Sequence, residues 1–221
     1  MKLFFEAIAK LLFGAALVGL LIFLPTGTLS FFGGRLFMGI LFIPMILAGI
    51  VMLFKDPKLL RKRLSVREKE KSQGQIVKLS GLMFVLGFIV SGLTFRFDLY
   101  VLPPEASIAG AVVFLLGYVV YAEVLRENAY LSRVIEVQQG QKVIDTGLYG
   151  IVRHPMYSAT LVMFLSIPVI LGSLYSLPVF AFYPILIIKR LKNEEKLLEE
   201  ELSGYTEYKK RVRYRLLPFV Y

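Results

Sequence analysis

Long apolar segments are the feature that most restricts how this chain can fold. Leu36–Phe54 and Leu79–Phe95 contain no ionisable side chain. A helix needs about 20 predominantly apolar residues to span a bilayer, and it satisfies its own backbone polar groups there. Hydrophobic residues make up 57% of the 221 residues and charged residues 19%, whereas a soluble domain has fewer of the former and more of the latter. The sequence therefore predicts an all-α integral membrane protein.

Six apolar segments are expected to form helices, the last two as a short hairpin that turns at Gly172 and Ser173. Their limits are Leu3–Leu24, Leu36–Phe54, Leu79–Phe95, Ala106–Tyr121, Tyr157–Leu171 and Leu174–Ile188. Because Glu6 and Lys10 interrupt the first segment, a second interpretation makes it a signal peptide. No small-x-small cleavage site follows in Pro25–Ser30, so we favour a retained span.

The basic residues are distributed unevenly between the loops. If Met1 is cytoplasmic and all six segments cross the membrane, 24 of the 26 lysines and arginines lie on the cytoplasmic side, and only Arg35 and Arg96 lie outside. This is the bias that orients membrane proteins. The net charge of +10 is therefore mainly a topology signal, with contact to anionic lipids as a consequence. Nucleic-acid binding is not expected, and both termini and any active site are expected to be cytoplasmic.

Cysteine and histidine usage excludes several kinds of site. The chain has no cysteine and a single histidine, His154. A disulfide scaffold, a thiolate metal site and a cysteine nucleophile are therefore excluded, as is a metal centre built from several histidines of this chain. We expect no metal.

The segment before the fifth apolar stretch carries β-prone residues. Val134–Val137 and Lys142–Asp145 flank a glycine-bearing turn at Gln138–Gln141. Two such runs around a turn predict a small cytoplasmic β-hairpin.

Polar residues gather where the fifth helix is expected to begin. Pro155 suits a first helical turn, because its missing N–H is not needed there. Arg153, His154 and Tyr157 would then surround a helix N-terminus, which favours a ligand carboxylate. The alternative is that Arg153 only anchors the topology, Tyr157 lies at the membrane interface and His154 caps the helix.

A charged helix follows the sixth apolar segment. Leucines at helical spacing predict an amphipathic helix near the C-terminus; they are Leu191, Leu197, Leu198 and Leu202. Glu194 and Glu195 lie on the part of this helix nearest the membrane, where ionisable groups are costly and often functional. A plain solvated charge run is the alternative.

The order of these motifs resembles one family. Gly147-Leu148-Tyr149-x-x-Val152-Arg153-His154-Pro155-x-Tyr157, an apolar hairpin, Glu194-Glu195, Gly204-Tyr205-x-x-Tyr208 and Leu217-Pro218 follow one another. This order is similar to that of the integral-membrane isoprenylcysteine carboxyl methyltransferases and phospholipid methyltransferases. The resemblance covers about Ser132 to Pro218. It divides the chain into an N-terminal part at 1–131, with four spans and a solvated basic loop at 55–78, and a methyltransferase core at 132–221.

The resemblance implies S-adenosylmethionine as the methyl donor and a cytoplasmic pocket for it. The implied cofactor-binding residues are Leu148, Tyr149, Arg153, His154, Pro155, Tyr157, Glu194 and Glu195. Arg190 and His154 are the implied catalytic residues. A carboxylate acceptor is already ionised at neutral pH, so Arg190 would only position it. An amine acceptor must lose a proton to His154, Glu194 or a tyrosine.

The implied function is methyl transfer to a lipidic or prenylated acceptor, with carboxyl O-methylation of an isoprenylcysteine-type substrate favoured. Three alternatives stay open: a phospholipid amine N-methyltransferase, an NADPH-dependent sterol or steroid reductase with a similar Tyr–Arg–His–Pro–x–Tyr element, and a non-enzymatic scaffold or transporter. A transporter should carry charged groups in mid-span, and the second, third, fifth and sixth segments have none between their limits.

Overall fold

The computed structural model describes residues 2–64, 71–132 and 134–221. Five helical stretches in this part of the chain are long and apolar enough to cross a membrane. They are α1 (Lys2–Thr26), α2 (Phe32–Lys55), α4 (Lys71–Arg96), α5 (Pro104–Glu127) and the stretch Leu174–Glu201. The fifth predicted segment forms α6 (Pro155–Ile170), which is apolar but has only 16 residues.

Large apolar side chains cover the outside of the helices. Phe13, Leu24 and Phe54 expose 71%, 72% and 81% of their surface. A soluble protein rarely exposes apolar surface on this scale, so the prediction of a helical integral membrane protein is confirmed. The two charges that interrupt the first segment pair with each other on the outside of α1, where Lys10 Nζ donates to Glu6 Oε1 at 2.7 Å.

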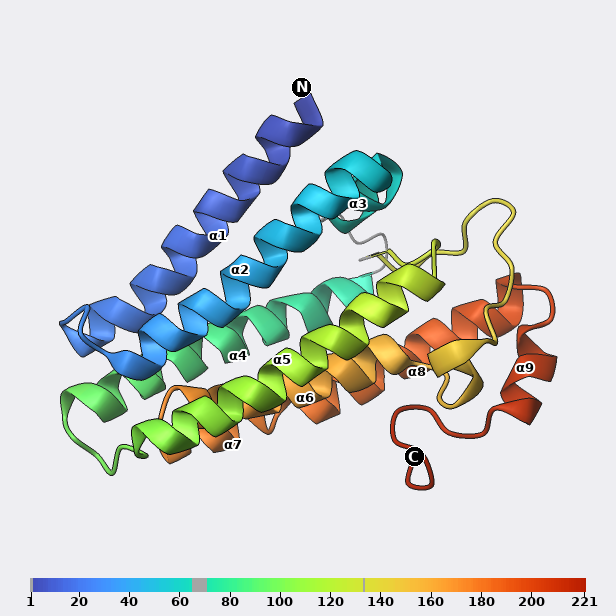
Figure 1. Ribbon diagram of the computed structural model, residues 1–221. Coiled ribbons are helices and arrows are strands. Elements are labelled where there is room, and N and C mark those ends of the chain that lie inside the picture. The colour runs from blue at the N-terminus through green and yellow to red at the C-terminus, as the bar shows by residue number, and fades with distance from the viewer. Residues whose placement is uncertain (1, 65–70, 133) are drawn as a thin grey trace.

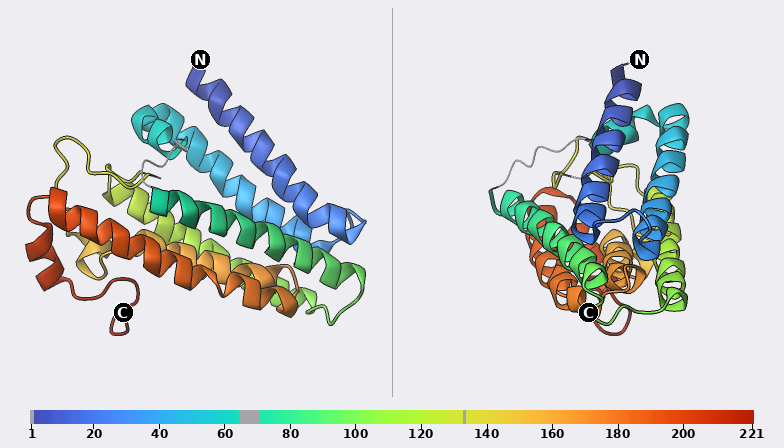
Figure 2. Two further views of the ribbon diagram at one scale, coloured as in Figure 1. Left: turned by 180° about the vertical axis from the view of Figure 1, so that it is seen from behind. Right: turned by 90° about the vertical axis from the view of Figure 1, so that its left-hand side faces the viewer.

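Pairs of helices pack along much of their length (Figures 1 and 2). The closest pair is α5 with α6, and α1 lies along α4. Glycine allows the approach of α5 to α6, because a Cβ on Gly117 would lie 2.5 Å from Met163 Cγ. The sequence places small residues at such helix contacts so that backbones can come together.

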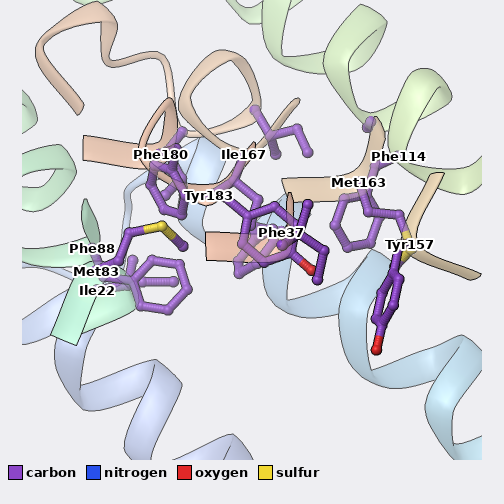
Figure 3. Close-up of a cluster of buried hydrophobic side chains, with 14 of the residues drawn as sticks. Ile22, Phe37, Met83, Phe88, Phe114, Tyr157, Met163, Ile167, Phe180 and Tyr183 are labelled. Atoms are coloured by element: carbon purple, nitrogen blue, oxygen red, sulfur yellow. The ribbon is translucent and has the colours of Figure 1, made fainter. Parts of the chain in front are cut away.

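Aromatic rings fill the centre of the bundle. Phe37, Phe88, Phe114 and Phe180 are at most 4% exposed and come from four different helices (Figure 3). A Cβ on Gly87 would lie 2.4 Å from the Phe180 ring, so glycine is needed on α4 to admit this ring. The cluster joins α2, α4 and α5 to α7 (Leu177–Phe180) in the C-terminal part of the chain.

The sixth predicted segment is not one helix. It is divided into η2 (Leu174–Ser176), α7 (Leu177–Phe180) and α8 (Tyr183–Glu201). Pro178 and Pro184 stand in the first turns of α7 and α8, and a proline begins a helix more readily than it continues one. The amphipathic helix predicted to continue from the sixth apolar segment is the second half of α8, which runs from apolar residues into the charged run without a break.

The predicted β-hairpin does not form: residues 134–145 contain no strand. The predicted turn is present, since Gln141 N donates to Gln138 O at 3.0 Å. Side chains take the place of a strand ladder there. Gln138 N donates to Gln141 Oε1 at 2.9 Å, and Gln138 Nε2 donates to Tyr130 O at 2.6 Å.

The basic loop expected at 55–78 is only partly a loop. Its residues 65–70 lie outside the described part of the chain, and α3 (Pro57–Leu64) precedes them. Asp56 starts this helix by accepting a hydrogen bond from Leu59 N at 3.0 Å, a typical cap. Leu59 and Leu60 are buried, so this short helix is anchored rather than solvated on all sides.

Candidate functional site

Residues far apart in the sequence meet at one end of the bundle. The irregular segment after α5, the 3-10 turn η1 (Gly147–Gly150), the end of α8, α9 (Tyr205–Arg211) and the C-terminal residues gather there (Figure 1). Backbone hydrogen bonds fix the C-terminal residues beside the start of α6: Arg153 N donates to Tyr214 O and His154 N to Arg215 O, both at 2.9 Å. Pro155 is the first residue of α6, as predicted.

Glu195 is the centre of a buried ion cluster. Its carboxylate accepts from Arg153 Nε at 2.6 Å and Arg215 Nε at 2.9 Å, and His154 Nε2 lies 3.2 Å away. Glu195, Arg153 and His154 are at most 6% exposed. Arg153 also donates to the backbone oxygens of residues 212 and 213. The cluster therefore ties α6, α8 and the C-terminal segment together.

Glu194 has different surroundings, although it is the preceding residue. Its Oε2 accepts a hydrogen bond from the Tyr157 hydroxyl at 2.5 Å. Arg190, one turn earlier on α8, donates from Nε to the same hydroxyl at 3.3 Å. Residues that are neighbours on a helix point about 100° apart, so the two glutamates of the pair face different parts of the molecule.

A cavity of about 100 Å³ lies against Glu194, Tyr157 and Arg190. Five of the nine predicted site residues line it: Tyr149, Arg153, Tyr157, Arg190 and Glu194. The other four lie outside its described lining: Leu148, His154, Pro155 and Glu195. The sequence-predicted set is thus brought to one region, but it is divided between the cavity wall and the ion cluster behind it.

Residues 134–145, which we call the cover segment, form much of the opposite wall. Glu136, Lys142 and Val143 of this segment line the cavity. Val143 also packs on an apolar cluster that includes Leu202 and Tyr208. Ligand sites typically hold about 300–1,000 Å³, so the cavity as it stands is smaller than a typical site for a molecule of nucleoside size.

Side chains from three elements fix the part of the cavity wall around Tyr149. The resemblance predicts that the adenosine packs near this residue. Asn128 Nδ2 donates to the Tyr149 hydroxyl at 2.8 Å, and the Tyr208 hydroxyl donates to the Tyr149 carbonyl at 2.8 Å. Leu148 N donates to Glu127 Oε2 at 3.1 Å. Gly147 is required here, because its φ is +50° and a Cβ would overlap the Glu127 carboxylate.

Tyr205 is a cavity residue to which the sequence reasoning assigned no role. It is 4% exposed, it lines the cavity, and its hydroxyl has no partner among the described residues. Burial raises the pKa of this phenol, and the charges of Glu195 and Glu194 raise it further. The hydroxyl is therefore neutral and can offer a proton to a ligand oxygen or nitrogen. The sequence feature that points to Tyr205 is the Gly204-Tyr205-x-x-Tyr208 motif.

No group of three or more histidine, aspartate or glutamate side chains suited to a metal ion occurs in the described part of the chain. The cavity presents tyrosine hydroxyls, an asparagine amide, the carboxylates of Glu136 and Glu194, and the basic side chains of Lys142, Arg153 and Arg190. This set fits a ligand that carries charges of both signs and hydroxyl groups, and S-adenosylmethionine, with a carboxylate, an ammonium, a sulfonium and ribose hydroxyls, has all of them.

Comparison with known proteins points to the same class. A family model described as phospholipid methyltransferase matches residues 106–203. The solved structure of a eukaryotic intramembrane Ras methyltransferase, isoprenylcysteine carboxyl methyltransferase, is similar in fold, with a TM-score of 0.62 and 19% identity over 97% of this chain and 77% of that one. The family model thus matches much of the region in which the motifs indicated this resemblance, and the solved structure shows the same fold over nearly the whole chain.

Sterol reductases are also similar in sequence. A Delta(14)-sterol reductase from Mus musculus is 33% identical over 90 residues, and one from Arabidopsis thaliana is 28% identical over 162 residues. These matches cover 39% and 64% of this chain, and the chain spans 22% and 43% of the length of the two reductases.

Proposed function

We propose that the protein transfers a methyl group from S-adenosylmethionine to a lipidic acceptor, and that the acceptor atom is a carboxylate oxygen of an isoprenylcysteine-type molecule. The observation that carries this proposal is the cavity bounded by Tyr149, Tyr157 and Glu194 in a chain whose residues 106–203 match the phospholipid methyltransferase model. We further propose that this end of the bundle faces the cytoplasm, as the distribution of basic residues indicates.

In this proposal each residue of the site has its own role. Glu194 balances the positive charge of the cofactor, and Tyr149 packs near its adenosine. Arg190 positions the acceptor carboxylate through charge-assisted hydrogen bonds. His154 and Glu195 do not line the cavity and have a positioning role. Their mutual contact at 3.2 Å keeps Arg153 and the start of α6 in place.

S-adenosylmethionine supplies a methyl group bonded to a positively charged sulfur. The acceptor oxygen forms a bond to the methyl carbon while the carbon–sulfur bond breaks, and the electron pair of the broken bond stays on the sulfur as a neutral thioether. A carboxylate acceptor needs no general base. What the chain must provide is alignment of the two reactants and exclusion of water, and alignment alone can supply several kcal/mol.

A second candidate is an NADPH-dependent reductase, which the similarity to sterol reductases favours. The two functions differ in the charge of the cofactor, since NADPH carries phosphates and S-adenosylmethionine is a cation. A carboxylate at Glu194 suits the cation, whereas Lys142 and Arg190 on the same cavity could serve a phosphate.

Isothermal titration of the detergent-solubilised protein separates the candidates. We expect S-adenosylmethionine and its demethylated product, S-adenosylhomocysteine, to bind, with no measurable affinity for NADPH. Binding of NADPH together with no binding of either sulfur compound would replace the methyltransferase proposal with the reductase.

A further inference from the structure

A buried glutamine on a membrane helix, outside the region that the family model matches, contacts Arg190 of the proposed site. Gln73 lies at the start of α4 and is 1% exposed. Arg190 NH1 donates to its Oε1 at 3.4 Å. Its Nε2 has no hydrogen-bond partner among the residues that the structure describes, while the family model matches only residues 106–203.

The buried Nε2 group of Gln73, which has no acceptor among the described residues, needs an explanation. A buried N–H without an acceptor loses its hydration and gains nothing in return, so such groups are rare and point to a missing partner. The carbonyl of the same amide is already engaged by Arg190. The missing partner of Nε2 must therefore be an acceptor, such as an oxygen, and not another donor.

Hydrogen bonds connect Gln73 with the cavity wall. Arg190, which contacts the Gln73 amide, also donates from Nε to the Tyr157 hydroxyl, and this hydroxyl donates to Glu194. Arg190, Tyr157 and Glu194 line the cavity. The Gln73 amide thus lies behind Arg190, on the side where α4 packs against α8.

The charges around the Gln73 amide favour one kind of methyl acceptor over another. The guanidinium of Arg190 and the Nε2 hydrogens of Gln73 are all donors, and one of the two groups is a cation. A carboxylate supplies two acceptor oxygens and a compensating charge. A lipid amine, which is an ammonium ion in its resting state, would meet like charge at Arg190 and no free acceptor on the Gln73 amide, whose carbonyl already accepts from Arg190.

We propose that Gln73 is a specificity-determining residue that binds an oxygen of the acceptor carboxylate next to Arg190. This inference rests on the proposed function and deepens it, because it assigns acceptor recognition to a membrane helix outside the matched region. The neutral amide contributes a directional hydrogen bond and adds no charge beside Arg190.

The test compares the same substitution at two glutamines of α4. Gln73→Glu replaces the donor with a carboxylate, and Gln75→Glu, at an exposed position of the same helix, is the matched control. Gln73→Met, which removes the donor without adding charge, is a second variant in case the glutamate prevents folding. The probes are N-acetyl-S-farnesylcysteine, its carboxamide and S-adenosylhomocysteine.

We expect both Gln73 variants to raise the Kd and the KM for the farnesylcysteine carboxylate about tenfold or more, the effect of one charge-assisted hydrogen bond. The kcat, the affinity for S-adenosylhomocysteine and the affinity for the carboxamide should stay within about twofold of wild type, and Gln75→Glu should change nothing. A merely structural role would lower all of these affinities together.

Unchanged affinity of both Gln73 variants for the carboxylate, with S-adenosylhomocysteine still bound, would overturn this inference and leave the proposed function intact. Parallel loss of carboxylate and S-adenosylhomocysteine binding would also overturn it. Wild-type protein that binds no S-adenosylhomocysteine would refute the proposed function itself, and this inference with it.

Discussion

Glu194 and Glu195 are adjacent in the chain, yet only Glu194 lines the cavity, where it accepts a hydrogen bond from Tyr157. Glu195 is 3% exposed and bound by Arg153 and Arg215. Removal of the first carboxylate should therefore affect a ligand, and removal of the second should affect the fold. This separation of roles can be measured directly.

Glu195→Gln should destabilise the protein. The substitution leaves the buried guanidinium of Arg153 without its counter-charge, and breaking a buried ion pair typically costs about 3–5 kcal/mol. Thermal unfolding in detergent should show a clearly lower midpoint. Glu200→Gln is the control, because Glu200 is exposed and its ion pair with Lys196 is a long surface contact of 3.9 Å. Equal unfolding midpoints for the two variants would contradict the structural role of Glu195.

Glu194→Gln should leave the unfolding midpoint near that of wild type and weaken S-adenosylmethionine binding about tenfold or more. The reason is that the variant loses a negative charge facing the cavity, and a hydrogen bond to a charged group contributes about 1.5–3 kcal/mol. Titration of both variants with S-adenosylmethionine measures this. Undiminished affinity would remove Glu194 from the cofactor site.

Tyr205→Phe and Tyr208→Phe should change stability in different ways. The Tyr205 hydroxyl has no hydrogen-bond partner within residues 2–64, 71–132 and 134–221, so its removal should be neutral or stabilising in the ligand-free protein and should lower cofactor affinity about three- to tenfold. The Tyr208 hydroxyl donates to Tyr149 O at 2.8 Å, so its removal should cost about 1 kcal/mol. If Tyr205→Phe were the more destabilising of the two, the proposed ligand contact would be wrong.

Gly147→Ala should be more damaging than Gly140→Ala. Both glycines have positive φ, +50° and +72°, which costs an L-residue about 1–2 kcal/mol. Space is open around Gly140, whereas a Cβ at Gly147 would displace the Glu127 carboxylate and its bond to Leu148 N. The difference between the two unfolding midpoints isolates the clash, and equal midpoints would show that the Glu127 contact contributes nothing.

The long helices were predictable because an apolar run in a bilayer has few alternatives to a helix. Pro155 also predicted the start of α6 correctly. The β-hairpin was wrong, because β-prone residues form strands only when they pair, and Gln138 instead uses side-chain hydrogen bonds within the segment. The local sequence does not contain this information.

The candidate site was predictable as a region but not as an arrangement. Motif order brought Tyr157, Arg190 and Glu194 together before their contacts were known. Whether Glu194 or Glu195 faces the cavity depends on the rotation of α8 against α6, which the spacing of two adjacent residues cannot specify. Gln73 could not be found at all, because it lies more than 100 positions from Arg190 and belongs to no motif.

The most direct test of the account is transfer of a radiolabelled methyl group from S-adenosylmethionine to a panel of acceptors. The panel contains a farnesylated cysteine, a geranylgeranylated cysteine and phosphatidylethanolamine, and the Glu194→Gln protein is the control. The account predicts that wild type labels a prenylated cysteine as a base-labile ester and that Glu194→Gln does so far more slowly at limiting cofactor. Label in phosphatidylethanolamine alone, or in none of the three, would contradict it.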